Sequence, residues 1–309
     1  MSPHSTDIIL HQYDGPAPFS AKTRVVLGIK QLSWYACPQP IIMPKPHLIP
    51  LTGGYRKIPV MQIGADVWCD TRAILHELER RHPTVGGIGQ GICDAVSSLC
   101  DRILFGFSIP LVFGGNTAVK MDEAFAKDRE AMSGQPFDPS AMAKAAPHAE
   151  AMLRAHLIAF DRDLADGRMF LGGDTPTQMD ASVFYLLQFA GAAYGGAHPK
   201  LADLSNLSAW ADRVREVGHG DRHETDGESA LAVAKSATPA APPPSLESDP
   251  LGLTLGMQVA VAADDYGRDP VLGELVSLGA DTVTVRRSAP EVGDVHVHFP
   301  RAGFTVTPA

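Results

Sequence analysis

The run 57–78 constrains the fold more than any other part of the chain. It starts with a short apolar segment after Pro59, turns at Gly64-Ala65-Asp66, and continues through a second apolar segment to Asp70-Thr71. A glycine-containing turn between two apolar segments predicts a hairpin of antiparallel strands. The Asp-Thr pair precedes apolar residues at helical spacing, which predicts the start of a helix. The predicted order is therefore strand, hairpin, strand and helix.

Pro59 stands where the first of these strands begins, because proline cannot donate to a strand ladder. A cis peptide bond before it would turn the backbone of Ile58 outward, free to pair with a group outside the protein. The helix that starts after Asp70 adds unpaired backbone amides at the other end of the run. The run therefore predicts a site for an extended, peptide-like ligand that carries a carboxylate.

This run resembles the second half of the N-terminal domain of glutathione S-transferases, which has a thioredoxin-like fold. The resemblance implies that Ile58 and Pro59 contact the cysteinyl backbone of glutathione. It also implies that Asp70 and Thr71 hold the γ-glutamyl end, with Asp-Thr in place of the commoner Glu-Ser. Glutathione is thus the expected ligand.

The residues before the run extend the resemblance over residues 7 to about 83. The pattern predicts a buried strand over 7–13, a turn, a helix over 19–30 and a second strand over 32–36. With the run 57–78 added, this is the thioredoxin-like order. The expected fold is an α/β thioredoxin-like N-terminal domain (1–84), then an all-α transferase C-terminal domain (85–221).

The turn between the first strand and the first helix departs from the family. Omega-type and related bacterial members carry Cys-Pro-Phe or Ser-Pro-Phe there, because a helix N-terminus stabilises a thiolate. This chain has Ala17, followed by Pro18 and Phe19. Three alternatives remain for activating the thiol: the helix-end amides alone, the hydroxyl of Tyr13, or the hydroxyl of Ser20, which is also suited to capping the helix.

Lys45 is the remaining candidate ligand of glutathione. Lys45-Pro46 matches a lysine-proline pair of omega-type transferases, whose lysine pairs with the glycyl carboxylate, and its distance from Ile58 fits that family without a gap. A solvated loop lysine is the alternative interpretation.

From Gly89 onward the pattern is helical. We expect helices over 92–104, 121–132, 141–164 with an interruption near Pro147, 181–189 and 201–217, and a structural capping box at Thr177 and Asp180. In the family, a second, hydrophobic substrate lies between the two domains. The resemblance suggests as its lining the residues Ser97, Asp101, Phe105 and Tyr185.

The last part of the chain has no counterpart in ordinary transferases. Residues 222–250, rich in Ala and Pro, indicate a linker or wrapping arm. Residues 251–309 alternate like short strands and predict a small all-β module, barrel or sandwich. His296 and His298 share a strand face, but no third ligand is apparent, so a solvent-facing pair is expected and no metal.

Composition narrows the functional classes. A net charge of -9 in 309 residues argues against a nucleic-acid partner. No apolar run suggests a membrane span and no leader pattern is seen, so a cytoplasmic protein is expected. The four cysteines lack the spacing of a disulfide framework or zinc site.

The sequence leaves the function open between classes. The first hypothesis is a homodimeric glutathione transferase that promotes thiol addition or elimination on a small, apolar electrophile. The second is a non-catalytic binding or assembly protein of the same fold, favoured by Ala17 and by the additional module. The third is an isomerase or ether-cleaving enzyme that uses glutathione as cofactor.

Overall fold

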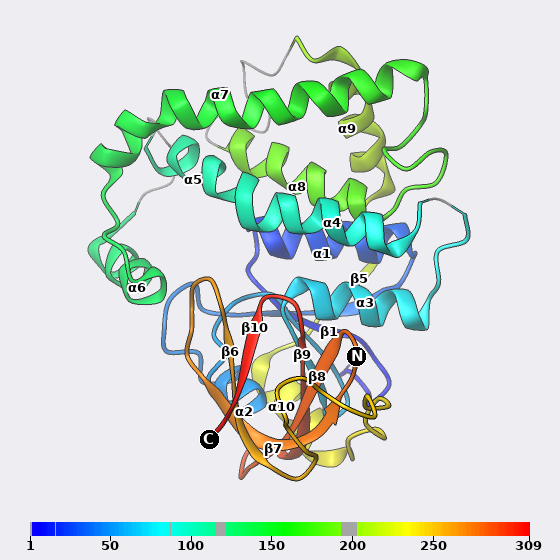
Figure 1. The fold of residues 1–309 in the computed structure, drawn as a ribbon, viewed down its shortest axis with the longest axis vertical. Helices are drawn as coiled ribbons and strands as arrows, with labels where there is room; N and C mark the ends of the chain where they lie inside the picture. Colours follow the sequence, from blue (N-terminus) through cyan, green and yellow to red (C-terminus); the bar gives the residue numbers. More distant parts are fainter. Residues whose placement is uncertain (1, 16, 87, 115–120, 193–202) are drawn as a thin grey trace.

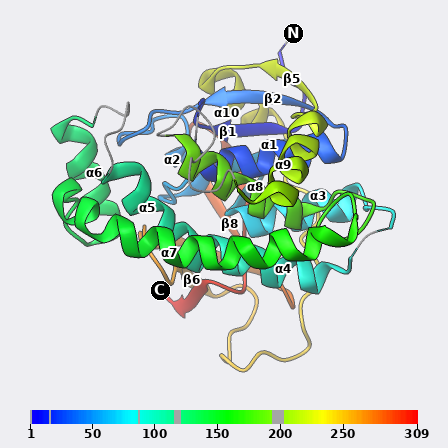
Figure 2. The same cartoon turned by 90° about the horizontal axis from the view of Figure 1, so that it is seen from above.

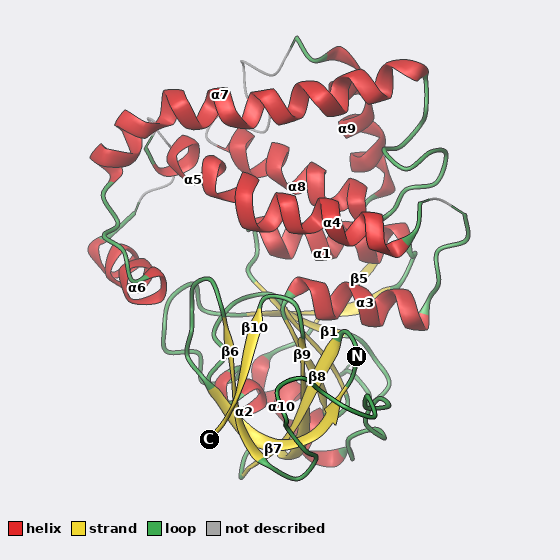
Figure 3. Ribbon diagram, viewed as in Figure 1, coloured by secondary structure: helices red, strands yellow, loops and turns green. Residues whose placement is uncertain are grey.

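The computed structural model describes residues 2–15, 17–86, 88–114, 121–192 and 203–309. Helices fill one half of the molecule and strands the other, and the first helix of the chain lies where the two halves meet (Figure 3).

The N-terminal domain has the predicted thioredoxin-like order. Its elements are β1 (Ile9–Gln12), α1 (Pro18–Ile29), β2 (Ser33–Pro38), α2 (Ile49–Thr52), β3 (Val60–Ile63), β4 (Asp66–Cys69) and α3 (Thr71–Arg81). β1 pairs with β2 in parallel and with β3 in antiparallel fashion, and β3 forms the predicted hairpin with β4. Gly64 makes the turn with a φ of 59°, a value that favours glycine. Only α2 was not predicted.

The helical domain follows. Its elements are α4 (Gln90–Leu99), the π-helix η1 (Cys100–Leu104), α5 (Phe105–Phe113), α6 (Glu123–Ser133), α7 (Pro139–Asp163), the 3-10 helix η2 (Leu164–Asp166), α8 (Gln178–Gly191) and α9 (Ser205–Val217). The capping box of Thr177 and Asp180 is confirmed at the start of α8. The predicted interruption near Pro147 was wrong, because α7 continues through this residue. Packing of Ala149, Leu153 and Leu157 in the core outweighs the hydrogen bond that proline removes.

One continuous helical stretch, Gln90–Phe113, is long and apolar enough by length and composition to cross a membrane. The expectation that no such run exists was therefore wrong. Length and composition alone are weak evidence for a membrane span, because core helices of soluble proteins share them. Only a third of the most apolar part of this helical stretch is buried. Several of its apolar residues line a cavity described below.

The predicted linker is partly wrong. Residues Asp221–Glu224 form β5, which pairs in parallel with β2, and Gly227–Ser236 form the helix α10. Figure 2 shows β5 beside β2, with β1 on the other side of β2. The Ala-rich composition suits a packed helix, since Ala230 and Ala234 are fully buried. Of the predicted linker, the last part, residues 237–250, forms no helix or strand.

The C-terminal module contains the predicted strands and one more, but it is not a separate barrel. Its strands are β6 (Gln258–Ala263), β7 (Val271–Leu278), β8 (Thr282–Ala289), β9 (Gly293–Pro300) and β10 (Phe304–Pro308). They pair in the order β10-β6-β7-β8-β9, and β9 pairs in parallel with β4 of the N-terminal domain. The two parts therefore share one ten-stranded sheet, which curves through the lower half of Figure 1.

The expected solvent-facing histidine pair was also wrong, because both rings are buried at the β4–β9 junction. His298 Nε2 lies 2.9 Å from Asp66 Oδ1, and its ring stacks on Trp68 with the centroids 4.7 Å apart. Thr284 Oγ1 lies 2.9 Å from the other ring nitrogen of His298. The backbone amide of His296 donates to the carbonyl of Ala65. These histidines join the module to the first domain.

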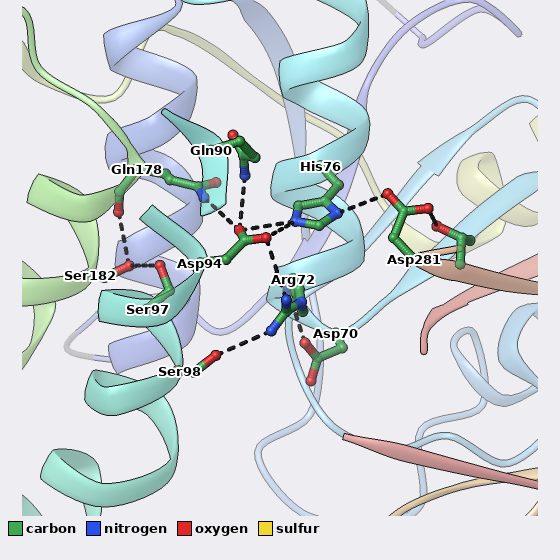
Figure 4. A network of polar contacts seen from close by, with 11 residues as sticks. Asp70, Arg72, His76, Gln90, Asp94, Ser97, Ser98, Gln178, Ser182 and Asp281 are labelled. Carbon is green, nitrogen blue, oxygen red and sulfur yellow. Dashed lines mark hydrogen bonds and ion pairs between the residues drawn. The ribbon is translucent and has the colours of Figure 1, made fainter. Parts of the chain in front are cut away.

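A second polar network joins all three parts of the chain (Figure 4). Asp94 on α4 accepts hydrogen bonds from His76 on α3 at 2.9 Å and from Gln178 on α8 at 3.0 Å. Gln90 and Arg72 add further donors to the same carboxylate. The other nitrogen of His76 lies 3.5 Å from Asp281, in the β7–β8 turn of the module. One carboxylate thus anchors the interdomain contact.

We expect Asp94→Asn to lower the free energy of unfolding by about 1–3 kcal/mol, because it removes a partly buried charge that accepts several hydrogen bonds. Urea unfolding followed by circular dichroism measures the change. Asp212→Asn is the matched control, since Asp212 is an exposed partner of Arg215 within one helix and such pairs contribute little. Equal stabilities of the two variants would contradict this role of Asp94.

The same network predicts a pH dependence. Burial alone would raise the pKa of Asp94, but the hydrogen bond and charge of His76, with the charge of Arg72, lower it. A lowered pKa means that the folded state binds fewer protons than the unfolded state, so the stabilisation is present above about pH 4 and declines as the pH falls further. The stability difference between wild type and Asp94→Asn should therefore narrow below pH 4. A difference that stays constant down to pH 3 would refute this assignment.

Candidate functional site

A polar cavity of about 90 Å³ lies where the three parts of the chain meet. The N-terminal domain lines it with residues around Ile58 and Asp70, and the helical domain with residues of α4 and η1. The module contributes the loop after β6 and the turn before β10. The name "polar cavity" is used below for this space.

Asp70 and Thr71, the pair expected to hold the γ-glutamyl end of glutathione, both line the polar cavity. Asp70 caps α3 by accepting a hydrogen bond from the amide of Arg72 at 2.9 Å. Its φ of 79° is rare for a residue other than glycine, and such backbone is found preferentially at binding sites. Burial raises the pKa of the Asp70 carboxyl, and the positive charge of Lys57 opposes this effect.

Ile58 and Pro59 form the wall beside this pair, and the peptide bond between them is cis. Among the described residues, no backbone hydrogen bond engages the amide or carbonyl of Ile58. The backbone of Ile58 is therefore free to pair with a ligand.

Asp101 closes the cavity from the helical side. It lies in η1, and π-helical turns inside α-helices are frequent at functional sites. Its Oδ2 accepts a hydrogen bond at 2.6 Å from Lys22, whose side chain is 1% exposed. Thr71 Oγ1 lies 3.5 Å from the same oxygen. The pair of Asp101 and Lys22 thus fixes α1 against the helical domain beside the site.

A second, larger cavity of about 610 Å³ adjoins the first. It is called the apolar cavity here, because phenylalanines of the helical domain dominate its wall. These are Phe105, Phe113, Phe125, Phe137 and Phe189. Phe113 contacts three of the others, with ring centroids 5.3–6.1 Å apart. The apolar face of α5 noted above therefore borders a cavity.

The four residues predicted to line a second-substrate site separate in the structure. Phe105 lines the apolar cavity and Ser97 the polar cavity, where Ser97 exchanges a hydrogen bond with Ser182. Asp101 lines both cavities. Tyr185 is fully buried against Phe19 and lines neither.

The N-terminus of α1 borders the apolar cavity through Ala17, Phe19 and Ser20. Ala17 caps the helix without a side-chain hydrogen bond. Within the described residues, the amides of Phe19 and Ser20 have no hydrogen-bond partner. These amides can therefore donate to an anion, whereas position 17 supplies no hydroxyl or thiol.

The two predicted hydroxyls near this helix end are both engaged. The Ser20 hydroxyl accepts from the backbone amide of Tyr13 at 3.3 Å and is 1% exposed. The Tyr13 hydroxyl donates to the carbonyl of Ile41 and accepts from Lys45 at 2.8 Å. Burial raises the pKa of Tyr13, with the charge of Arg129 opposing the shift.

Lys45 lies away from both cavities. Besides Tyr13, its ammonium contacts the carbonyl of Pro40. Burial and the nearby charge of Arg129 lower its pKa to about 8. Its ammonium is therefore held by oxygens of Tyr13 and of the loop after β2.

The sequence prediction missed Lys57 and the loop after β6. Lys57 lines both cavities and pairs with Asp265 at 2.9 Å. Its ammonium lies 4.6 Å from the ring centre of Tyr266. The position of Lys57 beside Ile58 was a usable signal, but nothing local connects Asp265 or Tyr266 with a site about two hundred residues earlier. Among the described residues, no group of three potential metal ligands is found.

Comparison with known proteins gives the family. The pattern of the glutathione S-transferase N-terminal domain matches residues 12–86, and that of the C-terminal domain matches residues 141–213. A GST-like protein from Pseudomonas syringae is 33% identical, with 98% of this chain and 100% of that chain covered and a TM-score of 0.81. That match therefore includes the β module. No curated protein matches.

Two more distant structures support the fold alone. A glutathione S-transferase from Rhodospirillum rubrum is 22% identical over 67% of this chain and 87% of its own, with a TM-score of 0.51. One from Methylobacillus flagellatus, with glutathione bound, is 17% identical over 69% of this chain and 99% of its own, with a TM-score of 0.50. The Pseudomonas match and the two domain patterns show that the chain belongs to the glutathione S-transferase family.

Proposed function

We propose that this protein binds glutathione and promotes addition or elimination of its thiol on a small, apolar electrophile. One observation carries the proposal: a polar cavity with open backbone and a helix start opens into an apolar cavity beside the N-terminus of α1. A hydrophilic thiol and a hydrophobic partner would thus be held side by side, which raises their effective concentration.

In this proposal the γ-glutamyl end lies at Asp70 and Thr71, and the cysteinyl backbone pairs with Ile58. For the glycyl carboxylate we propose Lys57 in place of Lys45, because Lys57 lines both cavities and Lys45 lines neither. The carboxylate would then replace Asp265 as the partner of Lys57. Because 90 Å³ is small for a tripeptide, part of the ligand would extend into the apolar cavity.

The chemistry follows from this placement. The thiol loses its proton to solvent, and the helix-end amides of Phe19 and Ser20 favour the thiolate. In the addition reaction, a bond forms between the glutathione sulfur and one carbon of the acceptor double bond. The electron pair of that double bond moves to the neighbouring carbon, which takes a proton from water. Elimination is the reverse, and it releases the thiol.

A non-catalytic binding protein of the same fold is the second candidate. It is favoured by Ala17 and by the engagement of the Tyr13 and Ser20 hydroxyls.

A location in the cytoplasm and a homodimer are parts of the first proposal that come from the family resemblance. The dimer must use a surface other than the β4 edge, which β9 occupies.

The first prediction for this site concerns glutathione affinity. Calorimetric titration of the purified protein should show a micromolar to low-millimolar dissociation constant. Thr71→Ala should raise that constant about tenfold, because a hydrogen bond to a charged carboxylate is lost. Thr307→Ala, in exposed β10, is the matched control. Failure of the wild type to bind would refute the transferase proposal, and equal affinities of both variants would refute the role of Thr71.

The second prediction concerns the apolar cavity. S-hexylglutathione should bind more tightly than glutathione, because its alkyl chain is buried among phenylalanines. Phe113→Ala should remove most of this advantage while the affinity for glutathione itself stays the same. Ile103→Ala is the control on the same helical stretch, since its side chain is half-exposed and outside both cavities. An unchanged ratio of the two affinities in Phe113→Ala would exclude this cavity as the second site.

A further inference from the structure

The boundary between the two cavities is formed by seven residues that line both. They are Phe19, Lys57, Ile58, Asp101, Arg102, Asp265 and Tyr266. A thiol held between a polar peptide and an apolar partner would have its sulfur at this boundary. Of the seven, only Tyr266 carries a hydroxyl, and it comes from the C-terminal module rather than from either transferase domain.

The loop that carries Tyr266 is fixed on three sides. Asp264 pairs with Arg102 of η1 at 2.7 Å, and Asp265 pairs with Lys57 at 2.9 Å. The amide of Gly267 donates to the carbonyl of Met132 at the end of α6, at 2.8 Å. Anchors at Asp264, Asp265 and Gly267 therefore reach η1, the N-terminal domain and the end of α6, and Tyr266 lies between them in the sequence.

The other polar side chains near the boundary are less suited to contact a sulfur. The nearby cations are already paired: Lys22 with Asp101, Lys57 with Asp265 and Arg102 with Asp264. The hydroxyls of Tyr13 and Ser20 are engaged by neighbouring groups, as described above. For the Tyr266 hydroxyl, by contrast, no hydrogen-bond partner is found among the described residues.

We infer that Tyr266 supplies the hydroxyl that position 17 lacks, by donating a hydrogen bond to the sulfur of bound glutathione. This inference rests on the proposed function and assigns the module a direct part in the site. Ala17 is then compatible with activity, because the donor is supplied by the loop after β6 and not by the start of α1.

The electrostatic surroundings suit a neutral donor. Burial raises the pKa of Tyr266, and the carboxylate of Asp265 on the same loop raises it further. Asp70 at the start of α3 and Asp101 in η1 act in the same direction, and Arg129 on α6 opposes them. Lys57 faces the ring. Tyr266 therefore keeps its proton at neutral pH and can donate it in a hydrogen bond to a thiolate.

The test is the pKa of glutathione bound to the full-length protein, followed by thiolate absorbance during a pH titration with saturating glutathione. Tyr266→Phe should raise that pKa by about one to two pH units, since it removes one hydrogen bond to an anion. Calorimetry should show that affinity for S-hexylglutathione, which has no thiol to ionise, changes less than twofold. Tyr35→Phe is the matched control, because Tyr35 packs against His223 outside both cavities.

The possible outcomes separate this inference from the proposed function. If the wild type binds glutathione and the thiol pKa is the same in Tyr266→Phe, the inference is overturned and the proposed function stands. A raised pKa in Tyr266→Phe alone supports it. A raised pKa in both tyrosine variants indicates a general structural effect and overturns it. Wild type that binds no glutathione refutes the proposed function, and the inference with it.

Discussion

The pairing of β9 with β4 is the interaction on which the rest of the structure depends. It makes one sheet out of the N-terminal domain and the C-terminal module, and the buried contact of Asp66 with His298 fixes its register. A parallel pair needs a long connection, which the chain provides by passing through the whole helical domain first. Without this pairing the loop after β6 would not reach Lys57, and the polar cavity would lack one wall.

The site combines a polar and an apolar cavity, which share seven lining residues. Buried ion pairs and a carboxylate network surround the polar cavity, whereas rings from four helical-domain segments surround the apolar cavity. The π-helix between α4 and α5 borders both cavities, because its residues Asp101 and Arg102 line each of them. Asp101 contacts Lys22, and Phe105, which follows the π-helix, lines the apolar cavity. The buried ammonium of Lys22 is tolerated because the carboxylate of Asp101 compensates its charge.

The sequence was most informative where the structure is local. The hairpin at Gly64, the cap at Asp70 and the box at Thr177 follow from short-range hydrogen bonding and turn chemistry, and all were predicted. Prediction failed where distant packing decides. Pro147 did not break α7, residues 222–236 were not a linker, and His296 and His298 were not exposed, because in each case the partner lies far away in the sequence.

The sequence by itself therefore determined the thioredoxin-like order, the family, and the position of Ile58, Asp70 and Thr71 at one end of a cavity. These depend on short-range patterns between residues 7 and about 83. Only the tertiary structure decided that Lys45 is held inside its loop, that Lys57 faces both cavities, and that Asp265 and Tyr266 complete their boundary. The reason is physical: a side chain's partner depends on which strands pair, and the pairing of β4 with β9 leaves no signal in either segment alone.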